Sequence, residues 1–371
     1  MRTFICTVGT SLVENDGVDS GYVQDLDNAS VDANPPAANK VKESIRKAIK
    51  NADTRDKKLA LSAEIKSLLS AEIAASDEVV LLHSDNKLGQ VCAEMLKEIL
   101  ELDKWVGCSV DVRRISDLQV QNFERMNKKG IRNLYEVVIG LIKAKGGEYN
   151  KNIILNITGG YKVVVPYLTI LGMLYNFKII YIFENSNELI TLPALPIKYD
   201  EELLLSAEEF LKKLFADGLL PADTFPKYLE QRRDEYIPAI IIESDGELML
   251  SAFGELLYQR FVQDYPEDLP KCKEKPEEKR LAFKDGEDKP PIVALARRLI
   301  LSPFVCEIVN SIPFHPGEIN RIRPNQNFEN GLVEIVLPKT DKGLGMVIRT
   351  TGRNPAETKQ IADLLAKQYK W

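Results

Sequence analysis

The chain has 371 residues, a length that predicts two or three domains, each large enough to bury a core of its own. With 44% hydrophobic residues, 28% charged residues and a formal net charge of −6, the composition is that of an ordinary globular protein. The sequence contains no apolar run of the length that a membrane span needs, and it opens without the features of a signal peptide, so we expect no membrane partner.

Cysteine, histidine and charge narrow the functional classes further. Five cysteines without paired spacing and only two histidines argue against a disulfide framework and against a zinc site. We therefore expect a cytoplasmic protein with reduced thiols and no bound metal. Residues 200–290 carry an excess of acidic side chains, whereas residues 291–371 carry an excess of basic ones. A locally basic segment favours polyanionic partners even on an acidic chain.

The first 195 residues alternate between apolar runs typical of buried strands and segments with the apolar spacing of amphipathic helices. This alternation predicts an α/β fold with right-handed crossovers and a mostly parallel, doubly wound sheet. The polar segment 16–39 is expected to be a flexible insertion. The expected strands are residues 2–8, 77–84, 108–115, 151–157 and 178–183, with prolines confining 188–197 to an edge, and the expected helices are residues 39–52, 58–75, 88–102, 122–145 and 161–176.

Beyond residue 200 the pattern changes. Residues 200–220 predict a helical connector, and residues 237–261 predict a strand-like run followed by a helix. The charged, proline-rich residues 264–291 are expected to form a mobile loop. A helix over residues 292–312, two strands joined by a turn, and a closing helix capped by Asn354 complete the expected elements.

Two of the expected strands end in glycines and small polar residues, in the sequences TVGTSL and NITGGYK. Glycine lets backbone amides approach a ligand, and helix N-termini attract phosphate. In a doubly wound sheet, ligands bind beyond the carboxyl ends of the strands, where the strand order reverses. We therefore expect one anion-binding pocket there, with a third strand end on the same rim. The residues expected to line it are Gly9, Thr10, Ser11, His83, Thr158, Gly159, Gly160 and Lys162.

Neither sequence is a common phosphate motif, because TVGTSL lacks the three-glycine dinucleotide spacing and TGGYK lacks the P-loop pattern. Together and in this order, however, VGTSL and NITGGYK make residues 1–195 resemble the CARF domain, the nucleotide sensor of type III CRISPR ancillary proteins. The resemblance implies a homodimer whose two pockets meet on the twofold axis. It implies that they bind a cyclic oligoadenylate, most often cyclic tetra-adenylate, as an allosteric activator, and that Asn156 also lines the pocket. Some CARF domains also cleave this ligand slowly, acting as ring nucleases by positioning a ribose hydroxyl.

A sensor needs an output, and two nuclease classes are disfavoured. Neither histidine has an arginine four to six residues upstream, which excludes a HEPN ribonuclease. The acidic–lysine run Glu277–Lys279 lies in the charged loop, where a restriction-type metal site is not expected. Residues 245–371, and best of all residues 331–358, resemble RelE-type mRNA interferases. The whole chain thus resembles the CARF–RelE fusions of type III CRISPR systems, which implies a metal-independent endoribonuclease without a cofactor that cleaves mRNA at the ribosome.

The chemistry of RNA cleavage suits a site without histidine or metal. RNA carries its own nucleophile, the 2′-hydroxyl, so lysine and arginine can stabilise the pentacovalent phosphate and the leaving oxygen. One strand departs from RelE, because Glu334 and Val336 stand where RelE has a pair of basic residues; some relatives use a glutamate there as the general base, which makes Glu334 a candidate base. The candidate catalytic residues are Arg321, Arg323, Glu334, Lys339, Lys342, Arg349 and Arg353.

These expectations divide the chain into a CARF domain over residues 1–198, a helical connector over 199–244 and an α+β RelE-like ribonuclease domain over 245–371. Two alternatives stay open. A winged helix within residues 200–262 would make the protein a nucleotide-controlled transcription regulator. A stand-alone ring nuclease would instead degrade the activator, with the tail as a dimerisation module.

Overall fold

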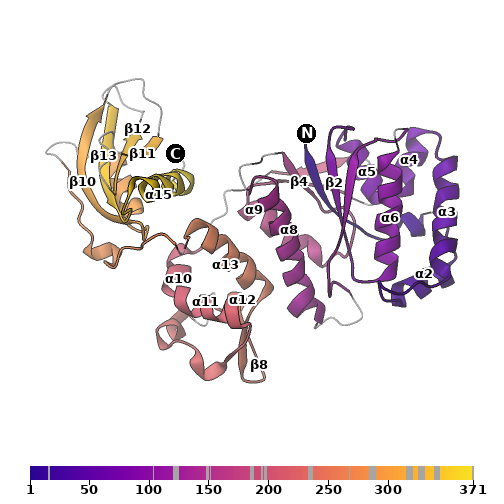
Figure 1. Ribbon diagram of the computed structural model, residues 1–371, viewed down its shortest axis with the longest axis horizontal. Helices are drawn as coiled ribbons and strands as arrows, with labels where there is room; N and C mark the ends of the chain where they lie inside the picture. The colour runs from indigo at the N-terminus through magenta and orange to yellow at the C-terminus, as the bar shows by residue number, and fades with distance from the viewer. Residues whose placement is uncertain are drawn as a thin grey trace. The chain divides into compact units, whose positions relative to one another are not determined.

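The computed structural model forms two compact units (Figure 1). Unit 1 consists of residues 1–199 and 209–257, and unit 2 of residues 200–208 and 258–371. The division after residue 257 falls inside a helix, so the two units share a continuous element. The described residues are 1–15, 17–102, 104–119, 125–147, 150, 152–183, 188–193, 195, 199–232, 237–266, 268–283, 290–314, 321–324, 331–337 and 343–369.

Unit 1 is built on a six-stranded sheet in the order β3-β2-β1-β4-β5-β6. Strands β1 to β5 run parallel, and β6 pairs antiparallel with β5 at the edge. The doubly wound α/β fold is therefore confirmed, as is the edge position of the proline-flanked segment. The strands are β1 (Thr3–Thr7), β2 (Glu78–His83), β3 (Ser109–Arg114), β4 (Ile153–Asn156), β5 (Lys178–Ile182) and β6 (Leu189–Leu192).

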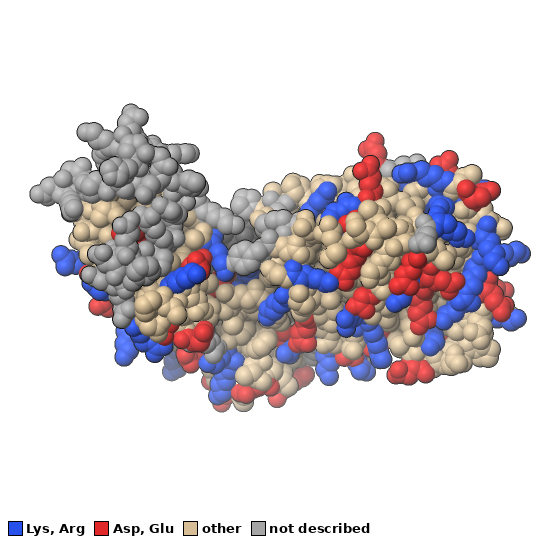
Figure 2. All heavy atoms as spheres, turned by 45° about the horizontal axis from the view of Figure 1, so that its top comes forward, with Lys and Arg blue, Asp and Glu red and all other residues tan. Residues whose placement is uncertain are grey.

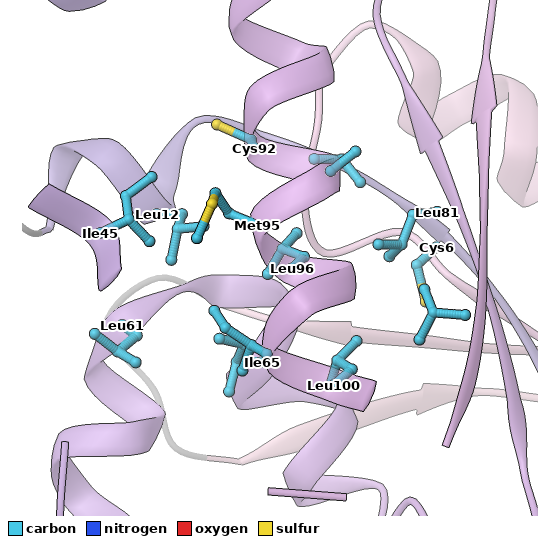
Figure 3. Packing of buried hydrophobic residues seen from close by; sticks show 14 of the residues in the cluster. Cys6, Leu12, Ile45, Leu61, Ile65, Leu81, Cys92, Met95, Leu96 and Leu100 are labelled. Atoms are coloured by element: carbon cyan, nitrogen blue, oxygen red, sulfur yellow. The ribbon is translucent and has the colours of Figure 1, made fainter. Parts of the chain in front are cut away.

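Alternate residues of the central strand β1 enter two separate cores. Phe4 and Cys6, both fully buried, pack with residues of α3, α5 and α6, as Figure 3 shows in part. Ile5 packs with residues of α8 and α9. Both faces of the sheet are thus covered, which explains why its strands are almost continuously apolar. The helices of this region are α1 (Ser11–Glu14), α2 (Ser20–Asn28), α3 (Ala37–Asn51), α4 (Arg55–Leu61), α5 (Ala63–Ser70), α6 (Lys87–Glu101), the π-helical η1 (Met126–Gly130), α8 (Ile131–Ala144) and α9 (Val164–Leu174).

Two segments of unit 1 differ from the prediction. The single helix expected over residues 58–75 is divided at Ser62, which is buried and caps α5 through its hydroxyl. Residues 16–39, expected to be a flexible insertion, contain α2. This helix is capped by the side chain of Asp19, and its fully buried Leu26 joins the core beside α3 and α6. Leu26, with the partly buried Val18 and Val23, thus packs an otherwise polar segment against the domain.

Residues 200–264 form short elements that follow the large sheet in the chain, and residues 209–257 of them belong to unit 1. The helical character expected for residues 200–220 is confirmed by two helices, and a three-stranded antiparallel sheet follows in the order β7-β9-β8. Leu256 is fully buried in the core that also holds α8 and α9. The elements are α10 (Glu201–Ser206), α11 (Glu208–Asp217), β7 (Leu220–Pro221), the 3-10 turns η3 (Ala222–Thr224) and η4 (Lys227–Arg232), α12 (Ile237–Ile240), β8 (Ile241–Ser244), β9 (Glu247–Leu250) and α13 (Ala252–Asp264).

Unit 2 contains a four-stranded antiparallel sheet in the order β10-β13-β12-β11. Helix α14 lies against β13, and α15 lies against β11 and β12. The predicted hairpin and closing helix are confirmed as β12–β13 and α15, and the N-cap role of Asn354 is confirmed by its bond from the N–H of Glu357. The elements are η5 (Pro276–Glu278), α14 (Pro290–Leu299), β10 (Val305–Phe314), β11 (Arg321–Pro324), β12 (Leu332–Leu337), β13 (Gly343–Thr350) and α15 (Pro355–Gln368).

The helix predicted over residues 292–312 is only half right. It ends at Leu299, and its second half is strand β10. Ser302 and Pro303 interrupt the helix, and the β-branched residues that follow favour an extended chain. The segment before the hairpin, for which no element was predicted, contains β11.

Part of the charged segment expected to be mobile is anchored to unit 2. Lys279 is 5% exposed, and its Nζ donates to the carbonyl oxygens of Ile300 and Ser302 at 2.8 Å each. Leu281 forms a parallel bridge with Ile308 of β10. Burial lowers the pKa of the Lys279 amine.

In the described ranges, no helix combines the length and the apolar character needed to cross a membrane. Lysine and arginine side chains are interspersed with aspartate and glutamate on the face shown in Figure 2. The charge distribution on this face therefore does not reveal a functional site. The strand order of the large sheet gives a better indication of where a ligand could bind.

Candidate functional site

Strands β1 and β4 meet where the strand order of the large sheet reverses. β1 pairs in parallel with β2 on one side and with β4 on the other, with Cys6 opposite Asn156. The carboxyl ends of the two strands therefore lie side by side, as expected for a ligand site at the switch point. We call the segments that follow them the β1 loop (residues 8–10) and the β4 loop (residues 157–163).

The β1 loop and the β4 loop pack backbone against backbone. A Cβ atom added at Gly9 would lie 2.7 Å from the backbone nitrogen of Gly160, too close for any side chain. Gly160 has a φ of +86°, a conformation that favours glycine. The hydroxyl of Thr7 at the end of β1 donates to the carbonyl oxygen of Gly159. The structure thus brings the two glycine motifs together.

Asn156 and Thr158 shape the β4 loop. Asn156 is 1% exposed, and its Oδ1 accepts from the backbone N–H and the hydroxyl of Thr158, at 3.3 and 2.8 Å. Its Nδ2 donates to the hydroxyl of Ser67 on α5 at 2.7 Å. Thr158 Oγ1 also accepts from the N–H of Ile182 at 3.2 Å. These contacts order the loop from within, so its outward groups are held in place.

The hydrogen-bonding groups of the β1 loop have protein partners. The Gly9 N–H donates to Oε1 of Glu64 at 2.6 Å, and the Ser11 hydroxyl donates to Oε2 of the same carboxylate at 3.1 Å. The Thr10 hydroxyl donates to Glu14. Glu64 was not predicted from the sequence. The available signal was an acidic residue in the first turn of a helix, a common and unspecific feature.

His83 and Lys162 differ in their surroundings. His83, at the end of β2, is 4% exposed, and its Nδ1 lies 2.8 Å from the carbonyl oxygen of Ser84, to which it donates. Burial lowers the pKa of this imidazole, which favours the neutral form. Lys162 in the β4 loop is exposed. Its neighbour Tyr161 accepts from Nδ2 of Asn86 at 3.4 Å.

A polar hollow of about 360 Å³ lies beyond the carboxyl ends of β2 and β3. Within its lining, Asp85 accepts from Nε of Arg114 and Asn86 donates to Asp27, both at 2.7 Å. Carboxylate, amide and guanidinium groups together can hydrogen-bond the edge of a nucleobase. The residues that line the hollow are Asp27, Asn28, Ala29, Ser30, Asp85, Asn86, Arg114, Asp117, Gln119 and Arg125.

In unit 2 the strand register collects several candidate catalytic residues. Glu334 pairs with Val347 and Arg349 pairs with Leu332, so Glu334 and Arg349 belong to the same face of the sheet. Arg323 on β11 is the register partner of Glu334. Arg321 lies on the same edge strand, whereas Lys339 and Lys342 lie outside the described residues. The opposite face carries the fully buried Val333, Ile335, Met346 and Ile348.

Arg349 and Arg353 each form an ion pair at the surface. Nε of Arg349 lies 2.9 Å from Oε1 of Glu307, and Nη2 of Arg353 lies 2.9 Å from Oε1 of Glu357. The hydrogen bond from Arg353 lowers the pKa of the Glu357 carboxyl. Exposed pairs of this kind are weak, and a guanidinium can also pair with a phosphate group.

Comparisons with known proteins bear on unit 1. Residues 59–195 match the family described as CRISPR-associated protein (Cas_APE2256). The matched segment runs from α4 to beyond β6 and includes the β4 loop. No curated protein matches the chain.

Two solved structures are similar at low identity. Can2 from Sulfobacillus thermosulfidooxidans, in complex with cyclic tetra-adenylate, has 11% identity and a TM-score of 0.24, covering 74% of this chain and 69% of Can2. VC1899 from Vibrio cholerae has 10% identity and a TM-score of 0.25, covering 94% of this chain and 77% of VC1899.

Proposed function

We propose that this protein is a ribonuclease of type III CRISPR defence that is activated by a cyclic oligoadenylate. The observation that carries the proposal is the packing of two glycine-bearing loops at the β1/β4 switch point. The CRISPR-associated family match covers the β4 loop and supports the same assignment. In this proposal unit 1 senses the ligand and unit 2 cleaves mRNA at the ribosome in the cytoplasm.

The proposed ligand suits a doubled site. One chain offers one switch point, and a homodimer would present two of them to a ring of nucleotides with the same twofold symmetry. Lys162 and the outward backbone of the β4 loop would meet phosphate, and the polar hollow beyond β2 and β3 offers groups for a base. Cyclic tetra-adenylate is the expected ring size.

The proposed reaction uses the RNA 2′-hydroxyl as the nucleophile. Arg349 and Arg353 would leave their glutamate partners to stabilise the pentacovalent phosphate and the leaving oxygen. Glu334, on the same sheet face as Arg349, would accept the proton from the 2′-hydroxyl. The bond from the 2′-oxygen to phosphorus forms as the bond to the 5′-oxygen breaks, the leaving 5′-oxygen takes its proton from solvent, and a 2′,3′-cyclic phosphate remains.

The sensing half is tested by calorimetry. We expect the purified protein to bind cyclic tetra-adenylate more tightly than the rings of three and six units, with linear tetra-adenylate as the matched control. Lys162→Ala should weaken binding by about tenfold or more, since an exposed charge-assisted contact is lost. Absence of binding by any ring would remove the sensor function.

The cleavage half is tested on mRNA with and without ribosomes. Cutting should require cyclic tetra-adenylate, and Arg349→Ala or Arg353→Ala should abolish it while ligand affinity stays unchanged. Arg297→Ala on α14, another exposed arginine of unit 2, is the control and should retain full activity. Full activity in either test variant would exclude that arginine from the site.

The order of elements in residues 208–250 favours one alternative. Helix α11, strand β7, short helical turns and the β8–β9 hairpin follow one another, with β9 central in the small sheet. A helix, a strand, helical turns and a hairpin in this order are compatible with a winged helix, which reads DNA in transcription regulators. A gel shift on promoter DNA without any RNA cleavage would support that function.

A ring nuclease activity is compatible with the main proposal. Thr10 and Lys162 are both accessible at the switch point and could position a ribose hydroxyl for in-line attack. Incubation with labelled cyclic tetra-adenylate shows the activity directly, as linear products that accumulate with time.

A further inference from the structure

Helix α5 contacts the β1 loop through a buried acid. Glu64 is 1% exposed, and its two carboxylate oxygens accept from the Gly9 N–H at 2.6 Å and from the Ser11 hydroxyl at 3.1 Å. The Ser11 oxygen in turn accepts from the N–H of Ala63 at 3.1 Å. The carboxylate therefore fixes both the backbone and the side chain of the segment that follows β1.

The same helix also contacts the β4 side of the site. A Cβ atom added at Gly159 would lie 1.9 Å from Oε1 of Glu64, so the carboxylate fills the space beside this glycine. Ser67, three residues after Glu64 and hence on the same helix face, accepts from Nδ2 of Asn156 at 2.7 Å. One turn of α5 thus holds the segments that follow β1 and β4 together.

Helix α5 is a rigid support. Ile65 and Leu68 are fully buried in the core that includes Cys6 of β1 and Leu96 of α6, and Figure 3 shows Ile65 beside residues of α6. The capping hydroxyl of Ser62 fixes the first turn, in which Glu64 lies. Side chains in close-packed cores transmit displacement rather than absorb it, so the Glu64 carboxylate has a defined position.

We propose that Glu64 is the positioning residue of the cyclic oligoadenylate site, an inference that rests on the proposed function. It acts through Gly9, Ser11 and Gly159 and does not touch the ligand itself. By holding the β1 and β4 loops in one arrangement, it removes the need to order them when the ligand binds. A preorganised loop loses less conformational freedom on binding, so the ligand binds more tightly.

Three variants separate positioning from charge. Glu64→Gln keeps an oxygen for the Gly9 N–H and offers an amide to the Ser11 oxygen, so we expect affinity for cyclic tetra-adenylate within about threefold of the unaltered protein. Glu64→Ala removes both contacts and should weaken binding by about tenfold or more, with a more unfavourable binding entropy in calorimetry. Glu64→Asp keeps the charge but is one methylene too short, and should resemble Glu64→Ala.

The control is Glu94→Ala on α6, a glutamate whose side chain is 39% exposed and pairs with Lys42. It should bind as the unaltered protein does. Urea unfolding checks that each variant is folded, and if Glu64→Ala is not, Glu64→Asp decides the question. A merely structural role would lower the unfolding midpoint and leave the affinity and binding entropy of the folded fraction unchanged.

The outcomes distinguish this inference from the function on which it rests. If the unaltered protein binds no cyclic oligoadenylate, the proposed function fails and this role of Glu64 fails with it. If the unaltered protein binds and a folded Glu64→Ala or Glu64→Asp binds equally well, only the positioning role is overturned. Weak binding by Glu64→Gln, comparable to Glu64→Ala, would also overturn it.

Discussion

Glu255 is a buried acid in the first turn of α13 whose carboxylate is incompletely paired. Oε1 lies 3.1 Å from Nη1 of Arg132 on α8, whereas Oε2 is buried and has no hydrogen-bond partner among the described residues. Burial raises the pKa of Glu255 to about 7, and the attraction of Arg132 opposes the shift without cancelling it. The folded protein therefore favours the protonated acid more than the unfolded chain does.

This pKa makes the stability of unit 1 depend on pH. Between the unfolded value of 4.5 and the folded value of about 7, the folded chain keeps a proton that the unfolded chain has released. The free energy of unfolding consequently falls as the pH rises through this window. Glu255→Gln should remove up to about 3 kcal/mol of that fall, measured by urea unfolding at pH 5 and pH 8.

The control for this prediction is Glu247→Gln in the β8–β9 hairpin, where the side chain is exposed. It should leave the pH dependence unchanged. An unaltered slope in Glu255→Gln would mean that Glu255 titrates as it does in the unfolded chain.

At the residue scale, the sequence predicted the glycines better than their partners. Gly9 and Gly160 could be placed because glycine after a strand has a backbone reason, and the structure brings the two together. Their roles in binding a ligand stay predictions. Glu64 could not be found, because it lies far from both motifs in the sequence and its spacing has no periodic signal.

At the element scale, the segment that contains Lys279 is fixed to the rest of unit 2 by hydrogen bonds from this lysine. Its amine ties the segment to the turn between α14 and β10 through two carbonyl oxygens. The amine and both carbonyl oxygens are buried, and a buried polar group that loses a hydrogen bond destabilises the fold. A lysine in a proline-rich, charged run thus serves as an internal anchor.

We expect Lys279→Met to destabilise unit 2 by about 2 kcal/mol, because methionine fills the space but cannot donate to the buried oxygens of Ile300 and Ser302. Among the described residues, the Ser302 oxygen keeps only the N–H of Val305 as a donor. Thermal unfolding followed by circular dichroism measures the change. Lys275→Met, on an exposed lysine of the same segment, is the matched control and should behave as the unaltered protein. Equal midpoints for both variants would contradict the anchoring role.

The helices and strands of unit 1 could be predicted because the hydrophobic patterns of both kinds of element are strong in its sequence. Buried parallel strands are continuously apolar, and the helices between them show one apolar face. The error at residues 292–312 arose because strand β10 is as apolar as the helix before it, so periodicity could not separate them. Segment 16–39 was misjudged because tertiary packing of Leu26 stabilises a helix that its composition does not favour.

At the scale of the whole molecule, α13 connects the proposed sensor with the proposed nuclease. The β4 loop leads into α9, whose Tyr167 stacks on Phe253 in the first turn of α13 with 4.9 Å between ring centroids. Helix α13 then continues into unit 2. We propose that a joint shift of the β4 loop and α9 on ligand binding would reach α13 through this aromatic contact.

Phe253→Ala tests this coupling. We expect unchanged affinity for cyclic tetra-adenylate but ligand-dependent mRNA cleavage reduced by about tenfold or more, since the stacked contact is lost. Binding by calorimetry and cleavage by gel electrophoresis give the two readings. Tyr228→Ala, with a ring that is 60% exposed, is the control. Normal cleavage by Phe253→Ala would exclude this route.

Residues 209–257 belong to unit 1, so we expect a fragment of unit 1 to need them in order to remain soluble. A fragment that stops at residue 198 lacks Leu256 and Phe253, so it uncovers apolar surface on α8 and α9. We expect this fragment to sediment with the insoluble material of a cell extract, whereas a fragment that stops at residue 264 remains in the supernatant. Centrifugation of the two extracts compares them directly. If the shorter fragment stays soluble, the β8–β9 hairpin and α13 are not needed for unit 1 to fold.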